Sequence, residues 1–442
     1  MIDSEKLKVE KYKDYILIFV IALVACVLYS FEALTQDVNF CPDEGMRYDI
    51  PLWIFRNHRL PVGNEPELRS PLWGISYGFS PYFPSLVSVC LMKLVSLFSS
   101  TDTSLFLAAR FSSVVAGTVT VAIVFLIGRE SFKYRLSAVV LSVLVAFLPQ
   151  FSFLSSYLNN DVYTVFCSAM ILLSWIKGTK SAWNLSSCLL LGLGCGILAL
   201  SYYNGYGWIL CSIIYFFVSN KGRKYTFVLN RFAFIFLLVF AIAGWYFIRN
   251  IVIYNGDVFG LKTSLFYSEK YAVPKLKPSN RLTYRNKGLS IVSLMMERNW
   301  WKLTIRSYFA VFGYMNVNAP GKVYKLYRCI LFVGFVNFCI AACKHKLLQK
   351  KFIFTILLAG CICIPVLLSL YYSWGSDYQP QGRYIIASLL PVMYFVSWGY
   401  DEFDDAFFPF KKKYIGIALC FVWLSLFAFC YKTMFFDIFV QG

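Results

Sequence analysis

Three short polar motifs interrupt an apolar sequence, and their side chains are of types that can do chemistry. The acidic pair Asp43-Glu44 directly follows the first long apolar run, where packing gives no reason for carboxylates. The sequence Asn-Asn-Asp at 159–161 separates two later runs, and 376–384 opens another with Arg383 near its end. A carboxylate can accept a proton from a hydroxyl group, and a guanidinium binds phosphate or carboxylate. Because ionisable groups at membrane depth are costly, these motifs are candidates for one functional site.

Each motif also has a purely structural explanation. Asp43-Glu44 suits a solvated loop, and the residues at 159–161 suit the cap of a helix that starts at 162. A long cationic side chain at the end of a span can extend to the lipid headgroups, which would account for three arginines: Arg110, Arg249 and Arg383. The functional interpretation therefore depends on whether the three motifs lie on the same side of the membrane.

The composition predicts a membrane protein. Of the 442 residues 59% are hydrophobic and only 15% are charged, which is more apolar surface than a soluble domain can bury. A formal net charge of +19 would suggest nucleic acid for a soluble protein. Here lysines and arginines beside anionic membrane lipids explain it, so we expect no nucleic-acid partner. The 14 cysteines are mostly dispersed in apolar runs and histidine occurs twice, which disfavours disulfides, a zinc site and histidine catalysis.

The hydrophobic runs predict an all-α polytopic protein with about 11 transmembrane helices. The predicted spans are 15–34, 107–127, 136–157, 162–176, 185–202, 205–218, 227–248, 326–343, 352–372, 384–399 and 414–431. The lysine-rich tail 1–13 predicts a cytoplasmic N-terminus by the positive-inside rule.

The apolar stretch 82–98, which contains Lys93, decides the rest of the topology. If this stretch lies along the membrane surface, five basic loops share the cytoplasmic side with the tail: 129–135, 177–180, 221–224, 344–351 and 411–413. If it spans, a 12-helix arrangement places all of these loops outside. We therefore expect 82–98 to be a juxtamembrane or re-entrant helix.

This topology predicts a single integral membrane domain over 1–442. After the tail come a first external loop at 35–105 with juxtamembrane helices and a long external loop at 249–325. The long loop has 13 Lys and Arg against 3 Asp and Glu, so it would attract phosphate groups of a substrate or of lipid headgroups. All three polar motifs then fall on the external side, where carboxylates from the first two could meet Arg383 in one cavity.

The motifs, taken in order, resemble those of a known superfamily. They read Pro-Asp-Glu at 42–44, Ala-Arg-Phe-Ser at 109–112, Gly-Arg-Glu-Ser-Phe at 128–132, Asn-Asn-Asp at 159–161, Trp-Tyr-Phe-Ile-Arg-Asn at 245–250, Phe-Gly-Tyr-Met-Asn at 312–316 and Tyr-Gln-Pro-Gln-Gly-Arg-Tyr at 378–384. Together they resemble the GT-C superfamily of polyprenyl-phosphate-sugar-dependent transferases, which includes protein O-mannosyltransferases and the lipid A aminoarabinose transferase. The resemblance is strongest to bacterial predicted membrane proteins. These often have a histidine a few residues after Pro-Asp-Glu, where this chain has Arg47 and Tyr48.

The resemblance implies a membrane glycosyltransferase, in the bacterial plasma membrane, with its active site outside. It implies Asp43 as the general base, and we add Glu44 and Asp161 as catalytic carboxylates that orient the acceptor or the sugar. If a divalent cation is used, Asp43 and Asp161 would hold it. Four residues are predicted to bind the donor phosphate: Arg110, Arg249, Gln381 and Arg383. Asn160 and Tyr378 are predicted to bind the acceptor or sugar.

The expected partners are a polyprenyl-phosphate-linked sugar, a glycan or lipid acceptor and membrane lipids. Attack opposite the lipid phosphate would invert the anomeric centre, since no second nucleophilic carboxylate is needed. Two other functions stay open. A polysaccharide polymerase of the O-antigen type would also use arginine-rich external loops, as the basic loop 249–325 allows. A lipid-linked-sugar flippase or transporter would need midplane charges, broken helices or a repeat, which the sequence does not show.

Overall fold

The computed structural model describes residues 2–38, 40–344, 347–407 and 414–436, and it is an all-α polytopic structure. The helices before the long loop are α1 (Ile2–Thr35), α2 (Glu44–Asn57), α3 (Phe83–Ser96), α4 (Asp102–Ser131), α5 (Arg135–Ala146), α6 (Pro149–Leu154), α7 (Asp161–Lys180), α8 (Leu185–Ala199), α9 (Tyr206–Ser219), α10 (Tyr225–Val239) and α11 (Trp245–Ile253). The later ones are α12 (Leu261–Tyr271), α13 (Ile291–Met296), α14 (Trp300–Phe309), α15 (Gly321–Lys344), α16 (Leu347–Gly375), α17 (Leu389–Phe407) and α18 (Tyr414–Cys430). A small antiparallel hairpin pairs β1 (Val311–Phe312) with β2 (Val317–Asn318).

Within the described residues, seven helices are long and apolar enough to cross a membrane. They are Glu10–Thr35, Asp102–Ser131, Asp161–Lys180, Tyr225–Ile253, Gly321–Lys344, Lys351–Gly375 and Tyr414–Thr433. Each contains or closely overlaps one predicted span. Helices form here because a chain in lipid must satisfy every backbone N–H and C=O group within itself.

The other predicted spans are built from shorter pieces, so the total of 11 stays a prediction. The run 136–157 is divided between α5 and α6, with Pro149 at the first turn of α6. Helices α8 and α9 have 15 and 14 residues, and 384–399 begins as a 3₁₀ helix, η6 (Gly382–Ser388), before α17. At 1.5 Å per residue, a 14-residue helix covers about 21 Å of a hydrocarbon core of about 30 Å.

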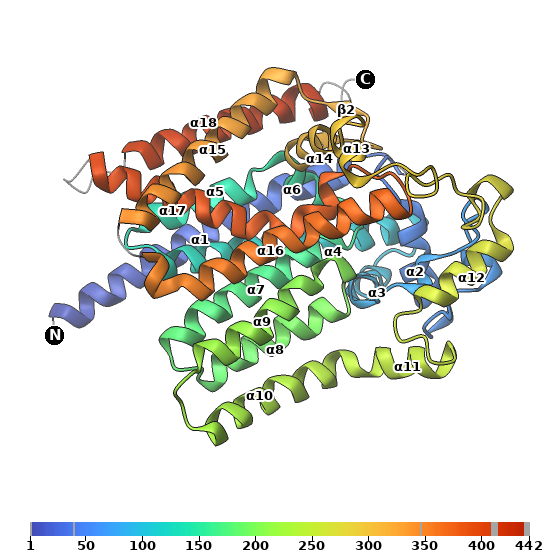
Figure 1. Cartoon of the computed structure of the whole chain (residues 1–442), viewed down its shortest axis with the longest axis horizontal. Helices are drawn as coiled ribbons and strands as arrows, with labels where there is room; N and C mark the ends of the chain where they lie inside the picture. The colour runs from blue at the N-terminus through green and yellow to red at the C-terminus, as the bar shows by residue number, and fades with distance from the viewer. Residues whose placement is uncertain (1, 39, 345–346, 408–413, 437–442) are drawn as a thin grey trace.

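Helix α3 covers the stretch on which the predicted topology depends. It has 14 residues and Lys93 in its last turn. In Figure 1 it is seen almost end-on, whereas the long helices α4, α7 and α16 run across the picture. A short helix that runs across a bundle suits a position along the membrane surface, as the 11-span interpretation requires.

The two ends of the bundle differ in character. At one end the first turns of α1 meet the basic loop 129–135, where Arg129 Nε lies 3.0 Å from Asp14 Oδ2 and Arg135 binds the same carboxylate. We call this the tail end. The opposite, loop end carries α2 and α3 together with the long loop that contains α12, α13 and α14 (Figure 1). Of the other predicted basic loops, 411–413 lies outside the described residues and 344–351 is only partly described.

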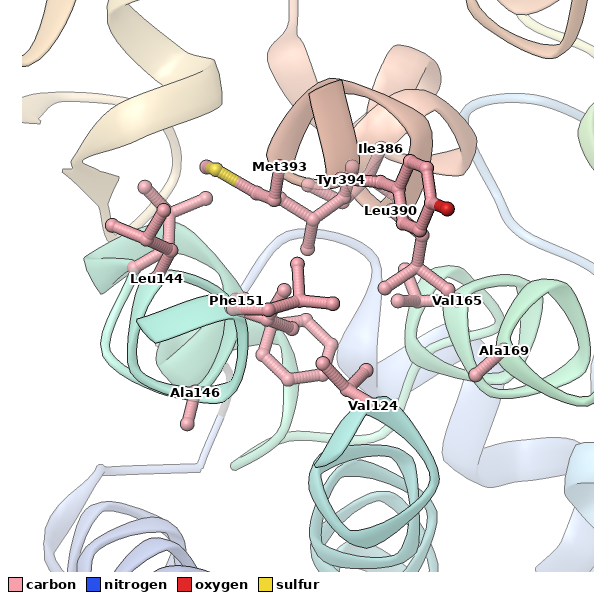
Figure 2. Close-up of a cluster of buried hydrophobic side chains, with 14 of the residues drawn as sticks. Val124, Leu144, Ala146, Phe151, Val165, Ala169, Ile386, Leu390, Met393 and Tyr394 are labelled. Atoms are coloured by element: carbon pink, nitrogen blue, oxygen red, sulfur yellow. The ribbon is translucent and has the colours of Figure 1, made fainter. Parts of the chain in front are cut away.

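The core lies where the central helices meet. Helix α4 packs against α1, α3, α5 and α7, while α17 packs against α5, α15 and α18. Figure 2 shows apolar side chains from several elements pointing toward one another, among them Val124 of α4, Phe151 of α6, Val165 of α7 and Leu390 of α17. This packing fixes α4, α7 and the η6–α17 junction relative to one another, and each of them contributes a residue to the site below.

Cysteine labelling will report which end faces out. We expect a membrane-impermeant maleimide, added to intact cells, to label Leu282→Cys at the loop end and not Lys133→Cys at the tail end. Leu282 is 78% exposed, so access does not limit its labelling. The background is a variant in which the exposed native cysteines are replaced by serine. Permeabilised cells, in which both sites should react, provide the control. Labelling of Lys133→Cys from outside would restore the 12-helix arrangement.

Candidate active site

The candidate base Asp43 is paired with Arg383 at the loop end. Asp43 immediately precedes α2 with φ of 62°, a left-handed conformation that turns the chain into the helix. Arg383 Nη2 donates to Asp43 Oδ2 at 2.6 Å. The Arg383 side chain is 3% exposed and that of Asp43 35%, so the carboxylate is the accessible member of the pair. Burial raises the pKa of Asp43, but the charges of Arg383 and Arg47 outweigh it and hold that pKa below its ordinary value.

A second carboxylate and a second guanidinium lie beside this pair. Asp161 opens α7 and is buried, and its Oδ1 has no hydrogen-bond partner among the described residues. Arg47 Nη1 donates to Asn160 Oδ1 at 2.8 Å, and its guanidinium lies 4.3 Å from the centre of the Tyr77 ring. Asp161 interacts electrostatically with both arginines and with Asp43. The four charges sum to zero in a largely buried cluster.

The polar residues before Arg383 form a hydrogen-bonded chain that orients its guanidinium. Arg383 Nε donates to Gln381 Oε1 at 2.7 Å, and Gln381 Nε2 donates to Gln379 Oε1 at 2.5 Å. Gln379 Nε2 in turn donates to Asp377 Oδ2 at 2.7 Å. Alternate side chains of the motif are thereby linked, from Asp377 to the candidate base.

Gly382 allows the backbone of this motif to lie close to α14. A Cβ atom at that position would lie 2.1 Å from the backbone nitrogen of Tyr308, a distance that backbone atoms cannot tolerate. The Gly382 N–H donates to Ser307 Oγ at 2.6 Å. The glycine between Gln381 and Arg383 is therefore needed for close packing against α14. This contact fixes the backbone from which the Arg383 side chain extends.

Glu44 and Arg110 lie together, away from solvent. Arg110 Nε and Nη2 donate to the two Glu44 carboxylate oxygens at 2.8 and 2.7 Å, and the side chains are 1% and 0% exposed. Its other N–H groups donate to the carbonyl oxygens of Ala33, Gln36 and Asp37. All five guanidinium donors are thus used within the protein. The pair joins the end of α1 to α2 and α4, so its geometry favours positioning over contact with a phosphate.

Two other predicted residues lie apart from the four charges. Arg249 Nη2 donates to the Pro61 carbonyl at 2.5 Å and its guanidinium lies 5.6 Å from the centre of the Tyr82 ring. No hydrogen bond or ion pair within the described part of the chain joins it to Asp43 or Asp161. Tyr378 donates to the Arg298 carbonyl and belongs to a separate pocket, described below.

Arg47 is the site residue that the sequence interpretation did not assign. In the sequence it stands near the position where relatives often have a histidine. The sequence feature that identifies Arg47 as a site residue is its spacing from Asp43, because residues four apart lie on one face of a helix. The Arg47 N–H donates to the Asp43 carbonyl at 3.0 Å, which forms the first turn of α2 and brings both side chains to the same cluster.

The donor set does not fit a resident divalent cation. Asp43 and Asp161, the residues predicted to hold one, both face guanidinium groups, which have no lone pair for a metal ion. The described residues contain no group of three His, Cys, Asp or Glu side chains that could hold a metal. Arg47 and Arg383 already supply the positive charge that a cation would bring.

Comparison with solved structures defines the class of fold. The oligosaccharyltransferase of Archaeoglobus fulgidus, solved with a tethered acceptor peptide containing an NVT sequon, is 15% identical and superposes over 95% of this chain and 54% of its own, with a TM-score of 0.58. The same enzyme in complex with an inhibitory peptide and a dolichol-phosphate is 15% identical over 95% and 55%, with a TM-score of 0.55. This chain therefore spans about half the length of the archaeal protein. It has the fold of the GT-C superfamily of membrane glycosyltransferases, so the resemblance indicated by the motifs is confirmed for the fold.

Within that class, residues 86–247 match the family model described as dolichyl-phosphate-mannose-protein mannosyltransferase, which covers less than half of the chain. ArnT from Cupriavidus metallidurans is 13% identical over 86% of this chain and 77% of its own, with a TM-score of 0.42. No curated protein matches the chain in sequence.

Proposed function

We propose that the chain transfers a sugar from a polyprenyl-phosphate donor to a hydroxyl group of a glycan, lipid or cell-wall polymer on the external face. The observation that carries the proposal is the Asp43–Arg383 pair beside Asp161 and Arg47 at the loop end. An accessible carboxylate held by a buried guanidinium supplies both a proton acceptor and an anion-binding group. The GT-C fold and the archaeal structure with dolichol-phosphate support a lipid-phosphate donor.

The proposed reaction is a single displacement. Asp43 accepts the proton of the acceptor hydroxyl as the hydroxyl oxygen attacks the anomeric carbon. The bond from that carbon to the donor phosphate oxygen breaks, and polyprenyl phosphate leaves with the electron pair. Attack from the opposite face inverts the anomeric centre. The proton then passes from Asp43 to solvent or to the departing phosphate.

Two buried donors support a phosphate site beside Asp43. Arg383 Nη1 and Arg47 Nε have no hydrogen-bond partner among the described residues. Buried polar groups are almost always hydrogen-bonded, so two unused guanidinium donors beside the accessible Asp43 carboxylate support an anion as their partner. Arg249 Nη1 is also unused, but no hydrogen bond or ion pair among the described residues joins Arg249 to this cluster. A phosphate bound to Arg383 Nη1 would also partly compensate the positive charge that Arg383 presents to Asp43. That change would raise the proton affinity of the base when the donor is bound.

The remaining roles follow from the contacts. Gln381 orients Arg383, and Asn160 orients Arg47. Asp161 balances the two guanidiniums and faces the sugar. We assign Glu44 and Arg110 to positioning, because their pair uses all the arginine donors. Arg249 instead anchors the first loop through Pro61.

Binding of polyprenyl phosphate to the purified protein tests the phosphate site. We expect Arg383→Ala to weaken binding by about 10- to 100-fold, since a charge-assisted hydrogen bond contributes about 1.5–3 kcal/mol. Arg383→Lys should retain part of the affinity, because lysine keeps the charge but not the fork of donors. Titration can be followed by intrinsic tryptophan fluorescence.

Arg249→Ala is the matched control for this experiment. It also removes a guanidinium at the loop end, but one that is anchored to Pro61 and not to the charged cluster. We expect its donor affinity to stay within twofold of wild type. Unchanged binding in Arg383→Ala together with a loss in Arg249→Ala would move the phosphate site to the first loop.

A further inference from the structure

A separate pocket lies at the loop end, where three distant parts of the chain meet. It has a volume of about 340 Å³ and lies between the long basic loop and the end of α16, with Trp73 of the first loop completing it. We call it the outer pocket. Of the two residues that the sequence predicts to bind the acceptor or sugar, Asn160 is bonded to Arg47, and Tyr378 lines this pocket.

The walls of the outer pocket combine aromatic rings and positive charge. Tyr284 and Tyr378 lie with ring centres 5.2 Å apart, and the Arg281 guanidinium lies 5.1 Å from the centre of the Trp73 ring. Arg281 Nε donates to the Leu276 carbonyl at 2.8 Å, so its guanidinium is held in place. Aromatic rings offer flat surfaces to the apolar faces of sugar rings, and guanidiniums bind carboxylates and phosphates.

The charges of the residues that line the pocket favour a ligand with negative charge. Lys275, Arg281 and Lys287 line the pocket, against one carboxylate, that of Asp377. Asp377 already accepts a hydrogen bond from Gln379 Nε2 at 2.7 Å. A neutral glycan would not use this excess of cations, whereas a chain with carboxylate or phosphate substituents would.

The outer pocket is connected to the candidate base. Asp377 on its wall begins the hydrogen-bonded chain through Gln379 and Gln381 to Arg383, which binds Asp43. Tyr372, at the end of α16, interacts electrostatically with Arg281 of the pocket and with Asp43 of the site. The wall of the pocket is therefore linked to Arg383 through two residues, Gln379 and Gln381.

We propose that the outer pocket is the acceptor site and that the acceptor is a sugar chain bearing carboxylate or phosphate groups. This inference rests on the proposed glycosyl transfer. A donor is a poorer occupant, because its phosphate group is already provided for by Arg383 and Arg47, and its isoprenoid tail needs the lipid rather than a charged loop. The sugar rings of the acceptor pack on Tyr284 and Tyr378 while its anionic groups bind Arg281 and Lys287.

Oligosaccharide binding to the full chain in neutral detergent tests the inference. The probes are tetragalacturonate, which carries a carboxylate on each ring, and maltotetraose, which is neutral. We expect the wild type to bind tetragalacturonate at least 10-fold more tightly than maltotetraose. The double variant Arg281→Gln/Lys287→Gln should lose at least 10-fold in affinity for the anionic probe. The control Lys302→Gln, an exposed lysine of the same loop outside the pocket, should lose less than twofold.

Three outcomes would overturn the inference: equal affinity for the two probes, an equal loss in the control variant, or no loss in the double variant. Vesicles distinguish lipid headgroups from glycans. If phosphatidylglycerol vesicles displace tetragalacturonate but phosphatidylcholine vesicles do not, the pocket binds headgroups and the inference fails. Polyprenyl phosphate binding is measured in the same variants and should not change. A wild type that fails to bind polyprenyl phosphate contradicts the proposed function instead, whatever the pocket binds.

Discussion

Asp43→Asn should reduce sugar transfer by about 100- to 10,000-fold, the range that a positioned general base contributes. Asparagine has nearly the same shape and can still accept a hydrogen bond from Arg383 through its amide oxygen, but it cannot accept the acceptor proton. Binding of polyprenyl phosphate should therefore persist, so the loss appears in turnover and not in donor affinity. The measurement is transfer from a labelled polyprenyl-phosphate sugar by purified protein, with donor binding followed in parallel.

Asp102→Asn is the control for this substitution. Asp102 lies at the start of α4 at the loop end, with its side chain 88% exposed, so transfer should stay within twofold of wild type. Asp161→Asn separates the two carboxylates of the cluster. If Asp43→Asn keeps near-normal turnover while Asp161→Asn is inactive, the base is Asp161 and the assignment of Asp43 is wrong.

The depressed pKa of Asp43 sets the expected acid limb of the pH profile. Arg383 and Arg47 hold that pKa below its ordinary 3.8, so the carboxylate is ionised throughout the neutral and mildly acidic range. Protonation of Asp43 in the protein without donor therefore cannot by itself reduce kcat/KM above about pH 4. A loss of kcat/KM that begins at higher pH must come from another group, whereas kcat can fall at a higher pH because bound phosphate raises the proton affinity of Asp43.

Local sequence patterns predicted the long elements and the position of the polar motifs. Seven of the predicted spans lie within long helices of the described residues, because lipid leaves the backbone no other way to satisfy its hydrogen bonds. The run 136–157 was predicted as one span, but the structure divides it at Pro149, whose missing N–H suits the first turn of a new helix. A hydropathy average over the run does not reveal such a break. The position of the proline is the better indicator of where the helix is divided.

The pairing of charges could not be predicted, because it depends on tertiary structure. Glu44 and Arg110 are 66 residues apart, and Asp43 and Arg383 are 340 apart. The sequence identified these residues as candidates because charge near lipid is costly. Only the packing of α4 against α1, α3 and α7 shows that Arg110 is enclosed by the protein while Arg383 is directed at the accessible carboxylate. Residue type alone predicts the same role for Arg110, Arg249 and Arg383.

Arg110→Met should destabilise the fold by about 3–5 kcal/mol, because it leaves Glu44 buried without a partner. Glu44→Gln should be less damaging, since a neutral amide can still accept one bond from the guanidinium. The double variant Arg110→Met/Glu44→Leu should lose less than the sum of its single variants, because no charge then remains buried. Thermal unfolding in detergent, followed by tryptophan fluorescence, should show the midpoint of Arg110→Met lowered by several degrees.

The exposed pair Arg56–Asp102 is the matched control, with N and O atoms 3.4 Å apart and side chains 60% and 88% exposed. A solvated pair contributes little, so Asp102→Asn should leave the midpoint almost unchanged. The same variants also test whether Arg110 is a phosphate ligand. If Arg110→Met unfolds at the wild-type temperature but no longer binds polyprenyl phosphate, Arg110 contacts the donor. If stability falls while the folded fraction still binds the donor, the guanidinium serves to hold α2 against α4, and thereby to hold Asp43 where the acceptor meets it.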